Sequence, residues 1–205
     1  RPASLSGPTR KMLEQIAPHQ PFGKRLVFAN LWLFEPLVIR QLEGKPETNA
    51  LVRTTMSPTL LEAGVKENVL PATASATLNF RLAPGETRDS LLAYLQNALP
   101  ENIRVTSRGT FLSDPSPVTE IPSATFDRLS ALARALPEQP LVAPYLLIAG
   151  TDARHYQHLS DQVFRFMPVS LGQDDLARFH GHNERLPREQ YPHMVRFYAG
   201  LMLGR

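Results

Sequence analysis

The sequence predicts an α+β fold in which helices cover one face of an antiparallel sheet. The first observation is an alternation over residues 72–82, where Ala, Leu and Phe occupy every second position between polar side chains. A period of two is typical of a half-buried antiparallel strand. The second observation is the order of elements, because a helical pattern over residues 91–99 and a strand pattern over residues 103–107 come next.

The segment before this strand predicts two helices and one further strand. Residues 9–17 place Met, Leu and Ile on one face, as in a short amphipathic helix. Residues 31–43 are a second helical candidate, in which Pro36 predicts a break or a first-turn position. Residues 49–55 are expected to form a strand, and we expect Trp32 in the core.

Turn and capping residues mark the starts of the elements that follow the strand over residues 72–82. Pro84 and Gly85 predict a turn, and Thr87 is a candidate N-cap for the helix that follows, which is expected to bury Leu91, Leu92, Leu95 and Leu99. Ser123 is a candidate N-cap for a second helix with an apolar stripe, and a final helix is expected to start near Pro187.

A Pro-rich stretch over residues 114–122 is the best candidate for a hinge between two domains. We therefore divide the chain into residues 1–112 and residues 113–205. In the second part, the apolar run 145–149 predicts a fully buried strand that ends in a functional loop, and residues 164–168 predict another core strand.

Composition excludes several classes of function. The chain has 42% hydrophobic and 20% charged residues, which is ordinary for a globular protein. Its net charge of +3 is small and scattered, so it gives no sign of nucleic-acid or membrane-surface binding. The absence of cysteine excludes disulfides and thiol chemistry, and no run reaches the roughly 20 apolar residues that cross a bilayer.

His180, in the segment His-Gly-His-Asn-Glu, is the candidate metal ligand. Imidazole is the commonest neutral ligand, and the nearby Glu184 is a potential partner for it. A zinc site needs three or four protein ligands, and the rest of the chain shows no such spacing. His180 is therefore either a histidine of a surface loop or one ligand of a metal site whose other ligands are not encoded in this chain. The start at Arg1 without methionine leads us to expect an upstream portion, with a processed N-terminus as the alternative.

Other polar residues stand where a ligand can be held. Asp152 follows the 145–149 run in a Gly-Thr-Asp-Ala-Arg segment and is either a binding residue or a helix cap. Arg81 lies on the polar face of the alternating strand, where its guanidinium can bind a carboxylate or simply face solvent. Asn68 precedes the same strand, where a role in the turn is the alternative.

Six segments in order resemble the carboxypeptidase S branch of metallopeptidase family 20, which includes Gly-X carboxypeptidase and the N-fatty-acyl-amino acid hydrolase-synthases. The resemblance runs from about residue 7 to residue 203. The segments are Trp-Leu-Phe-Glu-Pro-Leu at 32–37, Asn-Ala-Leu-Val-Arg-Thr-Thr at 49–55, Gly-Val-Lys-Glu-Asn-Val-Leu-Pro at 64–71, Thr-Leu-Asn-Phe-Arg at 77–81, Gly-Thr-Asp-Ala-Arg-His-Tyr at 150–156 and His-Gly-His-Asn-Glu at 180–184.

The resemblance implies a ferredoxin-like lid, or dimerisation, domain with a four-stranded antiparallel sheet and two helices, inserted into an α/β zinc-peptidase domain. Residues 1–112 would then be part of the lid, and residues 113–205 the C-terminal part of the catalytic domain. The implied partners are a second copy of the chain, joined through the lid, and a peptide or N-acyl amino acid substrate. The resemblance implies no nucleic-acid partner.

The resemblance also implies a role for each candidate residue. His180 matches the last zinc ligand, and Arg81 and Asn68 match lid residues that bind the substrate, Arg81 through its carboxylate. The loop that lines the same pocket is matched by four residues: Gly150, Thr151, Asp152 and Arg154. The family's other metal ligands, its lid histidine and its general-base glutamate have no counterpart here, so this chain contains no catalytic residue.

The intact enzyme is expected to hold two zinc ions, which activate water for amide hydrolysis while a glutamate moves the proton. The chain alone is expected to be inactive and to lack a complete zinc site. Two other functions remain open: a non-catalytic dimerisation module, and a binding module for N-acyl amino acids.

Overall fold

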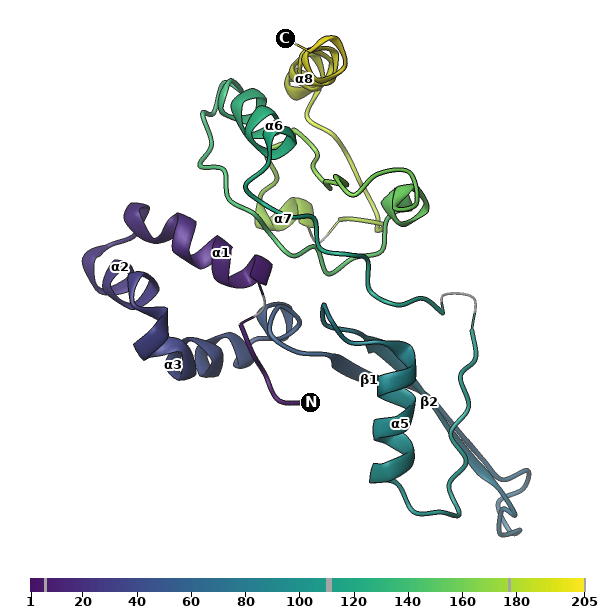
Figure 1. Ribbon diagram of the computed structural model, residues 1–205. Coiled ribbons are helices and arrows are strands. Elements are labelled where there is room, and N and C mark those ends of the chain that lie inside the picture. The colour runs from purple at the N-terminus through teal and green to yellow at the C-terminus, as the bar shows by residue number, and fades with distance from the viewer. Residues whose placement is uncertain (6, 110–111, 177, 205) are drawn as a thin grey trace. The chain divides into compact units, whose positions relative to one another are not determined.

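The computed structural model describes residues 1–5, 7–109, 112–176 and 178–204 (Figure 1). It divides into two compact units, each continuous in space but not in sequence. Unit 1 comprises Arg1–Val118 and Pro144–Gly150, and unit 2 comprises Thr119–Ala143 and Thr151–Arg205. The assignment of residues 1–112 to a lid and of residues 113–205 to a catalytic domain stays a prediction.

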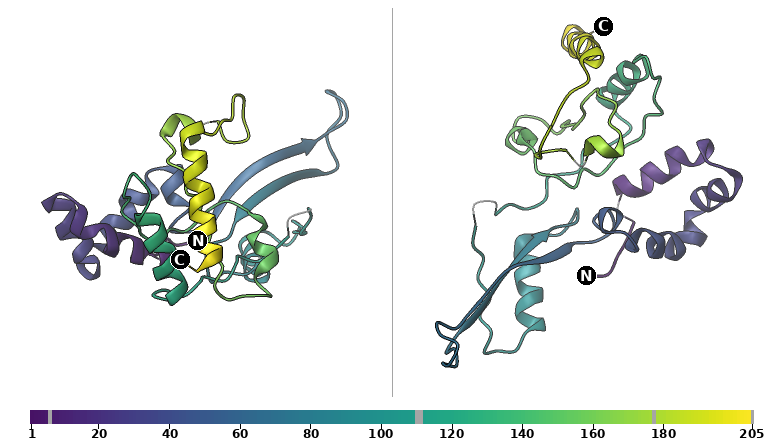
Figure 2. Two further views of the ribbon diagram at one scale, coloured as in Figure 1. Left: turned by 90° about the horizontal axis from the view of Figure 1, so that it is seen from above. Right: turned by 180° about the vertical axis from the view of Figure 1, so that it is seen from behind.

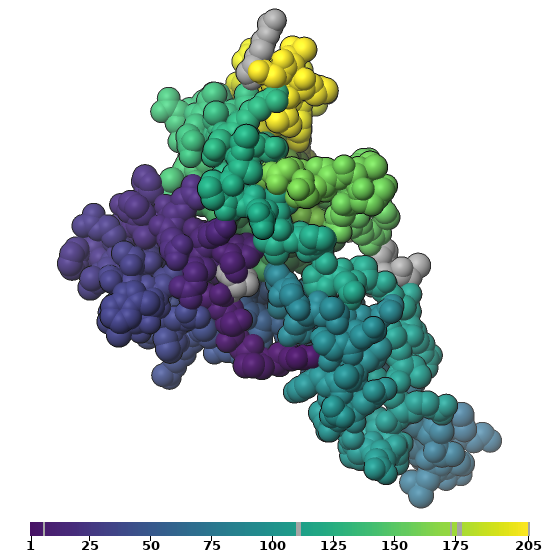
Figure 3. Space-filling model, in the orientation of Figure 1, coloured from purple at the N-terminus to yellow at the C-terminus, as the bar shows by residue number. Residues whose placement is uncertain are grey.

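Unit 1 begins with a cluster of helices that surrounds a small apolar core. The elements are α1 (Gly7–Ile16), the 3₁₀ turn η1 (Ala17–His19), α2 (Phe22–Ala29), α3 (Leu31–Glu43) and α4 (Pro46–Asn49). The core joins Leu13 of α1 to Leu31 and Val38 of α3, together with Leu5 and Val52. In Figure 3 the purple to blue spheres of this segment form one packed mass.

Two predictions for this segment are wrong. Helix α3 continues through Pro36 without a break. Trp32 is 78% exposed, because the inward face of α3 is formed by Leu31 and Val38 and the side chain of Trp32 points elsewhere. The helix itself has the predicted bounds, since its apolar residues recur with helical spacing.

A two-stranded antiparallel ribbon follows, formed by β1 (Thr55–Ala63) and β2 (Ala74–Arg81). Thr55 pairs with Arg81 at the base and Ala63 pairs with Ala74 at the other end, with an irregularity after Pro58. The turn that joins the strands lies at the free end of the ribbon in all three views (Figures 1 and 2). The strand predicted from the alternation over residues 72–82 is therefore confirmed as β2.

The predicted strand at residues 49–55 is wrong, because α4 and a turn occupy most of it and β1 starts at Thr55. Thr54 is buried and joins this turn to the end of β2. Its Oγ1 accepts a hydrogen bond from the Ala83 amide at 2.8 Å and donates one to a Glu86 carboxylate oxygen at 2.9 Å.

Helix α5 (Arg88–Ala98) has the predicted cap. Thr87 and Ser90 form a reciprocal capping box in which each hydroxyl accepts from the other's backbone amide. Residues 103–107 are not a strand, and the residues that the structure describes contain two paired strands rather than four. The α+β class is thus observed as helices with a two-stranded antiparallel sheet, and the ferredoxin-like arrangement stays a prediction.

Unit 2 is built on two helices, α6 (Ala124–Arg134) and α8 (Tyr191–Leu203), which pack against each other. Shorter elements are η2 (Asp152–Tyr156), α7 (Gln173–Leu176) and η3 (Arg188–Gln190). Ser123 caps α6 as predicted by accepting from the Phe126 amide at 3.2 Å. No described helix of the chain is long and apolar enough to cross a membrane.

Aromatic rings hold an extended segment against both helices. Phe164 lies 5.9 Å from Phe126 of α6, and Phe166 lies 5.2 Å from the buried Phe197 of α8, measured between ring centroids. The predicted core strand at residues 164–168 is wrong, because this segment forms no strand and Phe166 and Met167 are 42% and 43% exposed. Its carbonyls are instead satisfied by side chains, as when the Tyr198 hydroxyl donates to Phe166 O at 3.3 Å.

The predicted buried strand at residues 145–149 is also wrong. The run is not paired in a sheet, and Tyr145 is 57% exposed and Leu147 40% exposed. An apolar run becomes a buried strand only where neighbouring strands and a covering layer are available, and the described residues provide neither here.

Candidate functional site

Arg81 ends β2 and reaches the segment that leads into the Gly150 loop. Its backbone pairs with Thr55, and its Nη1 donates a hydrogen bond to the carbonyl oxygen of Ile148, two residues before Gly150. The side chain is exposed. A guanidinium has five N–H donors in a planar fork, so most of them stay available for a ligand. The structure therefore brings two sequence-predicted residues of unit 1, Arg81 and Gly150, into the same neighbourhood.

Asn68 lies at the opposite end of the ribbon. It is exposed in the turn between the strands, which begins with Gly64 at a φ of +74°. The seven residue steps from Ala74 to Arg81 cover about 23 Å at about 3.3 Å per residue of strand. Within one copy of the ribbon, Asn68 and Arg81 are therefore too far apart to contact the same small ligand.

The loop after Gly150 is a short 3₁₀ turn whose polar side chains face solvent. Thr151, Asp152 and Arg154 are all exposed, and the Arg154 amide donates to Thr151 O at 3.3 Å. The N-cap position of the turn belongs to Thr151 rather than to Asp152, so the interpretation of Asp152 as a cap is wrong. Arg154 Nε lies 3.2 Å from His155 Nε2.

His180 lies in a loop of unit 2 between α7 and η3, in an unusual backbone conformation. Its φ is +57°, in the left-handed region that few non-glycine residues adopt. The imidazole is exposed and meets the ring of Phe179 edge-on at 6.2 Å. Such outliers concentrate at functional sites, because the surrounding structure has to maintain them.

The loop that carries His180 is closed at its base by one side chain. The amide group of Gln190 accepts from Ser170 N at 2.8 Å and donates to Ser170 O at 3.3 Å. Within the loop, Asp175 accepts from the Gly172 amide at 3.0 Å and pairs with Arg178 at 3.1 Å. These bonds tie together the segments on either side of His180.

The residues present do not form a metal site by themselves. In the part of the chain that the structure describes, no group of three or more His, Cys, Asp or Glu side chains is placed to hold an ion. His180 offers one nitrogen, whereas zinc takes three or four protein ligands. Any metal at His180 therefore needs donors from outside the described residues.

A hollow elsewhere in unit 1 includes none of the predicted residues. It has a volume of about 440 Å³ and lies between α1, η1 and α2. Its lining residues are Glu14, Ala17, Pro18, Arg25, Phe28 and Ala29.

The predicted site residues are divided between the units. Asn68, Arg81 and Gly150 belong to unit 1, and Thr151, Asp152, Arg154 and His180 belong to unit 2. Their assigned roles stay predictions. Sequence reasoning missed Ile148 and Gln190, because a backbone carbonyl has no residue signature and an amide clamp across 20 residues has no characteristic spacing.

Comparison with known proteins identifies the family. Residues 8–106 match the peptidase dimerisation domain of the M20 family. The chain is 39% identical over 199 residues to the N-fatty-acyl-amino acid synthase/hydrolase PM20D1 of Xenopus tropicalis, which covers 96% of this chain and 38% of that protein. It is 37% identical over 195 residues to the probable carboxypeptidase S-like 2 of Dictyostelium discoideum, covering 95% of this chain and 37% of that protein.

More distantly, mouse aminoacylase-1 is 25% identical over 179 residues, covering 86% of this chain and 43% of that protein. No solved structure matches the chain. The chain spans about two fifths of the length of the curated relatives it matches. From the dimerisation-domain match and the similarity along nearly its whole length, the chain belongs to the M20 family of peptidases, in the group of carboxypeptidase S-like and PM20D1 proteins.

Proposed function

We propose that this chain is part of a zinc-dependent amidohydrolase or carboxypeptidase that cleaves the amide bond of a C-terminal amino acid or of an N-acyl amino acid. The supporting observation is the extent of the similarity. Because the match to the Xenopus protein covers 96% of the chain, it includes both the Arg81 strand and the His180 loop. The relatives' names describe carboxypeptidases and N-fatty-acyl-amino acid synthase/hydrolases.

In this proposal Arg81 binds the free carboxylate that both substrate classes share. An arginine binds a carboxylate through two parallel N–H···O bonds, which gives orientation as well as affinity. The bond from Arg81 to Ile148 O leaves other donors free, and it holds the guanidinium beside the Gly150 segment. The loop residues Thr151, Asp152 and Arg154 and the turn residue Asn68 are the further proposed substrate contacts.

His180 contributes one donor to a two-zinc site in the intact enzyme. The other donors and the general base lie outside the described residues, so we propose that this chain alone is inactive and holds no stoichiometric zinc. The left-handed backbone at His180 supports a special role for this residue.

The test uses the complete gene product that carries this sequence. His180→Ala should lower both bound zinc and the hydrolysis of an N-acyl amino acid, the latter by roughly a hundredfold or more. His182→Ala is the matched control, since His182 is an exposed histidine two positions along the same loop. Normal zinc content and activity in His180→Ala would refute the metal assignment, as would equal losses in both variants.

A second candidate is a non-catalytic dimerisation module. The match of residues 8–106 to a dimerisation domain supports it, and so does the ribbon, on which Leu60 is 57% and Leu61 79% exposed. An exposed strand edge can pair with a second copy. Sedimentation velocity of this chain distinguishes a dimer from a monomer, and titration with an N-acyl amino acid in the absence of metal tests the binding-module alternative.

A further inference from the structure

The outward face of α3 is apolar where a surface helix is normally polar. Leu31 and Val38 point into the core, and with about 100° between successive residues the opposite side carries Trp32, Leu33 and Leu37. These three side chains are 78%, 55% and 56% exposed. They are therefore surface residues that the fold of unit 1 does not use.

Helix α2, the element directly before it, repeats this pattern. None of its eight residues is buried, and Phe22 and Leu26, one turn apart, are 71% and 47% exposed. We call Phe22, Leu26, Trp32, Leu33 and Leu37 the α2–α3 apolar side chains. Single exposed apolar residues are common, whereas several on two consecutive helices indicate an interaction surface.

The unpaired charges on the same two helices are all positive. Residues 22–43 are all described and contain two carboxylates, Glu35 and Glu43, and each forms an ion pair with an arginine of a neighbouring element. Lys24, Arg25 and Arg40 are exposed, and no ion pair joins them to a carboxylate within the described residues.

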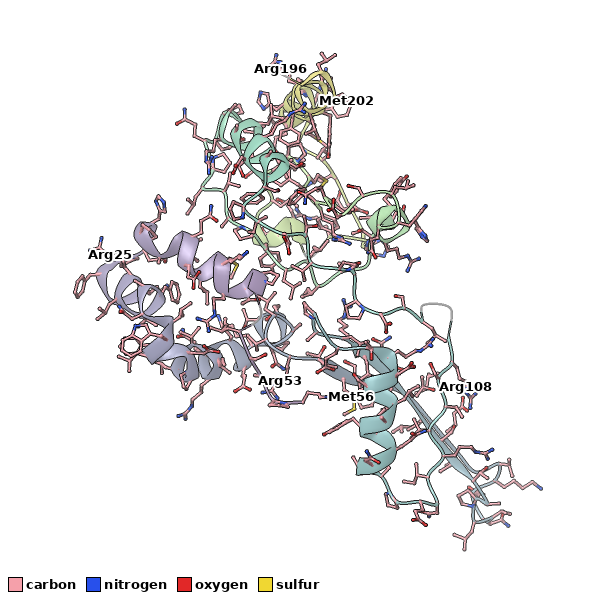
Figure 4. All side chains as sticks on the ribbon, in the orientation of Figure 1. Arg25, Arg53, Met56, Arg108, Arg196 and Met202 are labelled. Carbon is pink, nitrogen blue, oxygen red and sulfur yellow. The ribbon has the colours of Figure 1, made fainter. Side chains whose placement is uncertain are left out.

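Arg25 illustrates the arrangement of charge and apolar surface. It is exposed on α2 (Figure 4) and also lines the hollow between α1, η1 and α2. Its guanidinium carbon lies 5.9 Å from the centroid of the Phe22 ring. A long basic side chain can keep its charge in water while its stem covers apolar surface.

We propose that the α2–α3 apolar side chains dock on the surface of an anionic lipid bilayer, with both helices lying in the interface. Interfacial helices combine Trp, Phe and Leu on one side with Lys and Arg beside them. Tryptophan favours the boundary between headgroups and acyl chains, and each basic residue gains from the negative surface potential. Since no described helix can cross a membrane, the helices would lie on the bilayer.

The charges favour a lipid surface over a second copy of the same face. Lys24 lies about 180° around α2 from Phe22 and Leu26, so only Arg25 and Arg40 border the apolar side chains. Pairing two such faces would bring these arginines of both copies together without a free carboxylate of α2 or α3 between them, which is unfavourable. The whole-chain charge of +3 does not indicate membrane binding, because the opposite charges that balance it lie on other elements.

Trp32 is the only tryptophan of the chain, so it reports directly on the proposed surface. Its fluorescence should shift to the blue when the chain is mixed with vesicles of phosphatidylcholine containing about one-quarter phosphatidylglycerol. With roughly fivefold per cation, three cations give about a hundredfold tighter partitioning than to phosphatidylcholine alone. Added salt of about 0.5 M should remove most of this difference.

The double variant Leu33→Ser/Leu37→Ser should weaken partitioning by about tenfold or more, because it removes two apolar groups and leaves Trp32 in place. The matched control is Leu159→Ser/Met202→Ser, which removes two side chains of unit 2 that are 70% and 80% exposed. Flotation of the complete gene product with the same vesicles tests whether the face is accessible in the longer protein.

Three outcomes would overturn the proposal. One is no shift with anionic vesicles, or an equal shift with phosphatidylcholine. Another is a blue-shifted Trp32 without lipid in a chain that sediments as a dimer, which would assign the face to a second copy. The third is a complete gene product that does not float although the 205-residue chain binds, which would mean that another part of the longer protein covers the face.

Discussion

Replacement of Arg81 by alanine gives the sharpest test of the substrate assignment. A charge-assisted pair contributes about 1.5–3 kcal/mol. Because Arg81 is exposed, water screens the pair and the lower part of this range applies. With about 1.4 kcal/mol for each factor of ten, kcat/KM for an N-acyl amino acid should fall about 10- to 30-fold in the complete gene product.

The assay compares two substrates that differ in one group. The first has the free carboxylate, and the second has the corresponding carboxamide, which offers no negative charge to Arg81. If Arg81 binds the carboxylate, Arg81→Ala should reduce kcat/KM for the first substrate and change the second little. Arg81→Lys should give an intermediate value, because an ammonium keeps the charge but lacks the planar fork that also reaches Ile148 O.

The control is Arg104→Ala, which removes another exposed arginine of unit 1. Unchanged kcat/KM in Arg81→Ala would refute carboxylate binding. Equal losses with both substrates would instead show that Arg81 acts by holding the Ile148 segment in place.

Three further predictions concern stability and order. Thr87→Ala should lower the free energy of unfolding of unit 1 by about 1 kcal/mol in urea denaturation, whereas Thr87→Ser, which keeps the capping hydroxyl, should change it little. Phe197→Ala should destabilise unit 2 by about 3–5 kcal/mol, because the ring is 4% exposed and contacts Phe166; an effect below 1 kcal/mol would contradict this packing. Gln190→Ala should speed amide hydrogen exchange in residues 178–186 around His180 while α6 stays protected, and unchanged exchange would show that the hydrogen bonds of Gln190 to Ser170 are dispensable.

Local elements were predictable because their causes are local. The bounds of α3 follow from helical spacing, and the starts of α5 and α6 follow from the hydroxyls of Thr87 and Ser123, which satisfy backbone amides of the first turn. The strand β2 follows from its alternation. Each signal depends on neighbours within a few residues, so the sequence displays it directly.

Strands without such alternation were not predictable. The apolar runs at residues 145–149 and 164–168 were predicted as strands but form none, because apolar character alone does not say whether a segment will find a partner strand. β1 was missed, because Pro58 and polar residues interrupt its pattern and its partner is β2 across a turn. Pairing is a non-local property, and the chain must bring distant segments together before it exists.

The candidate site shows the same division. The residue types and their order predicted the family and named Arg81 and His180, and the family is confirmed by the comparisons. The contact of Arg81 with Ile148 O, the left-handed backbone at His180 and the exposure of Trp32 appear only in three dimensions. The chemical type of a residue and its local conformation are determined by short stretches of sequence. Its exposure and its contacts depend on how the remainder of the chain folds around it.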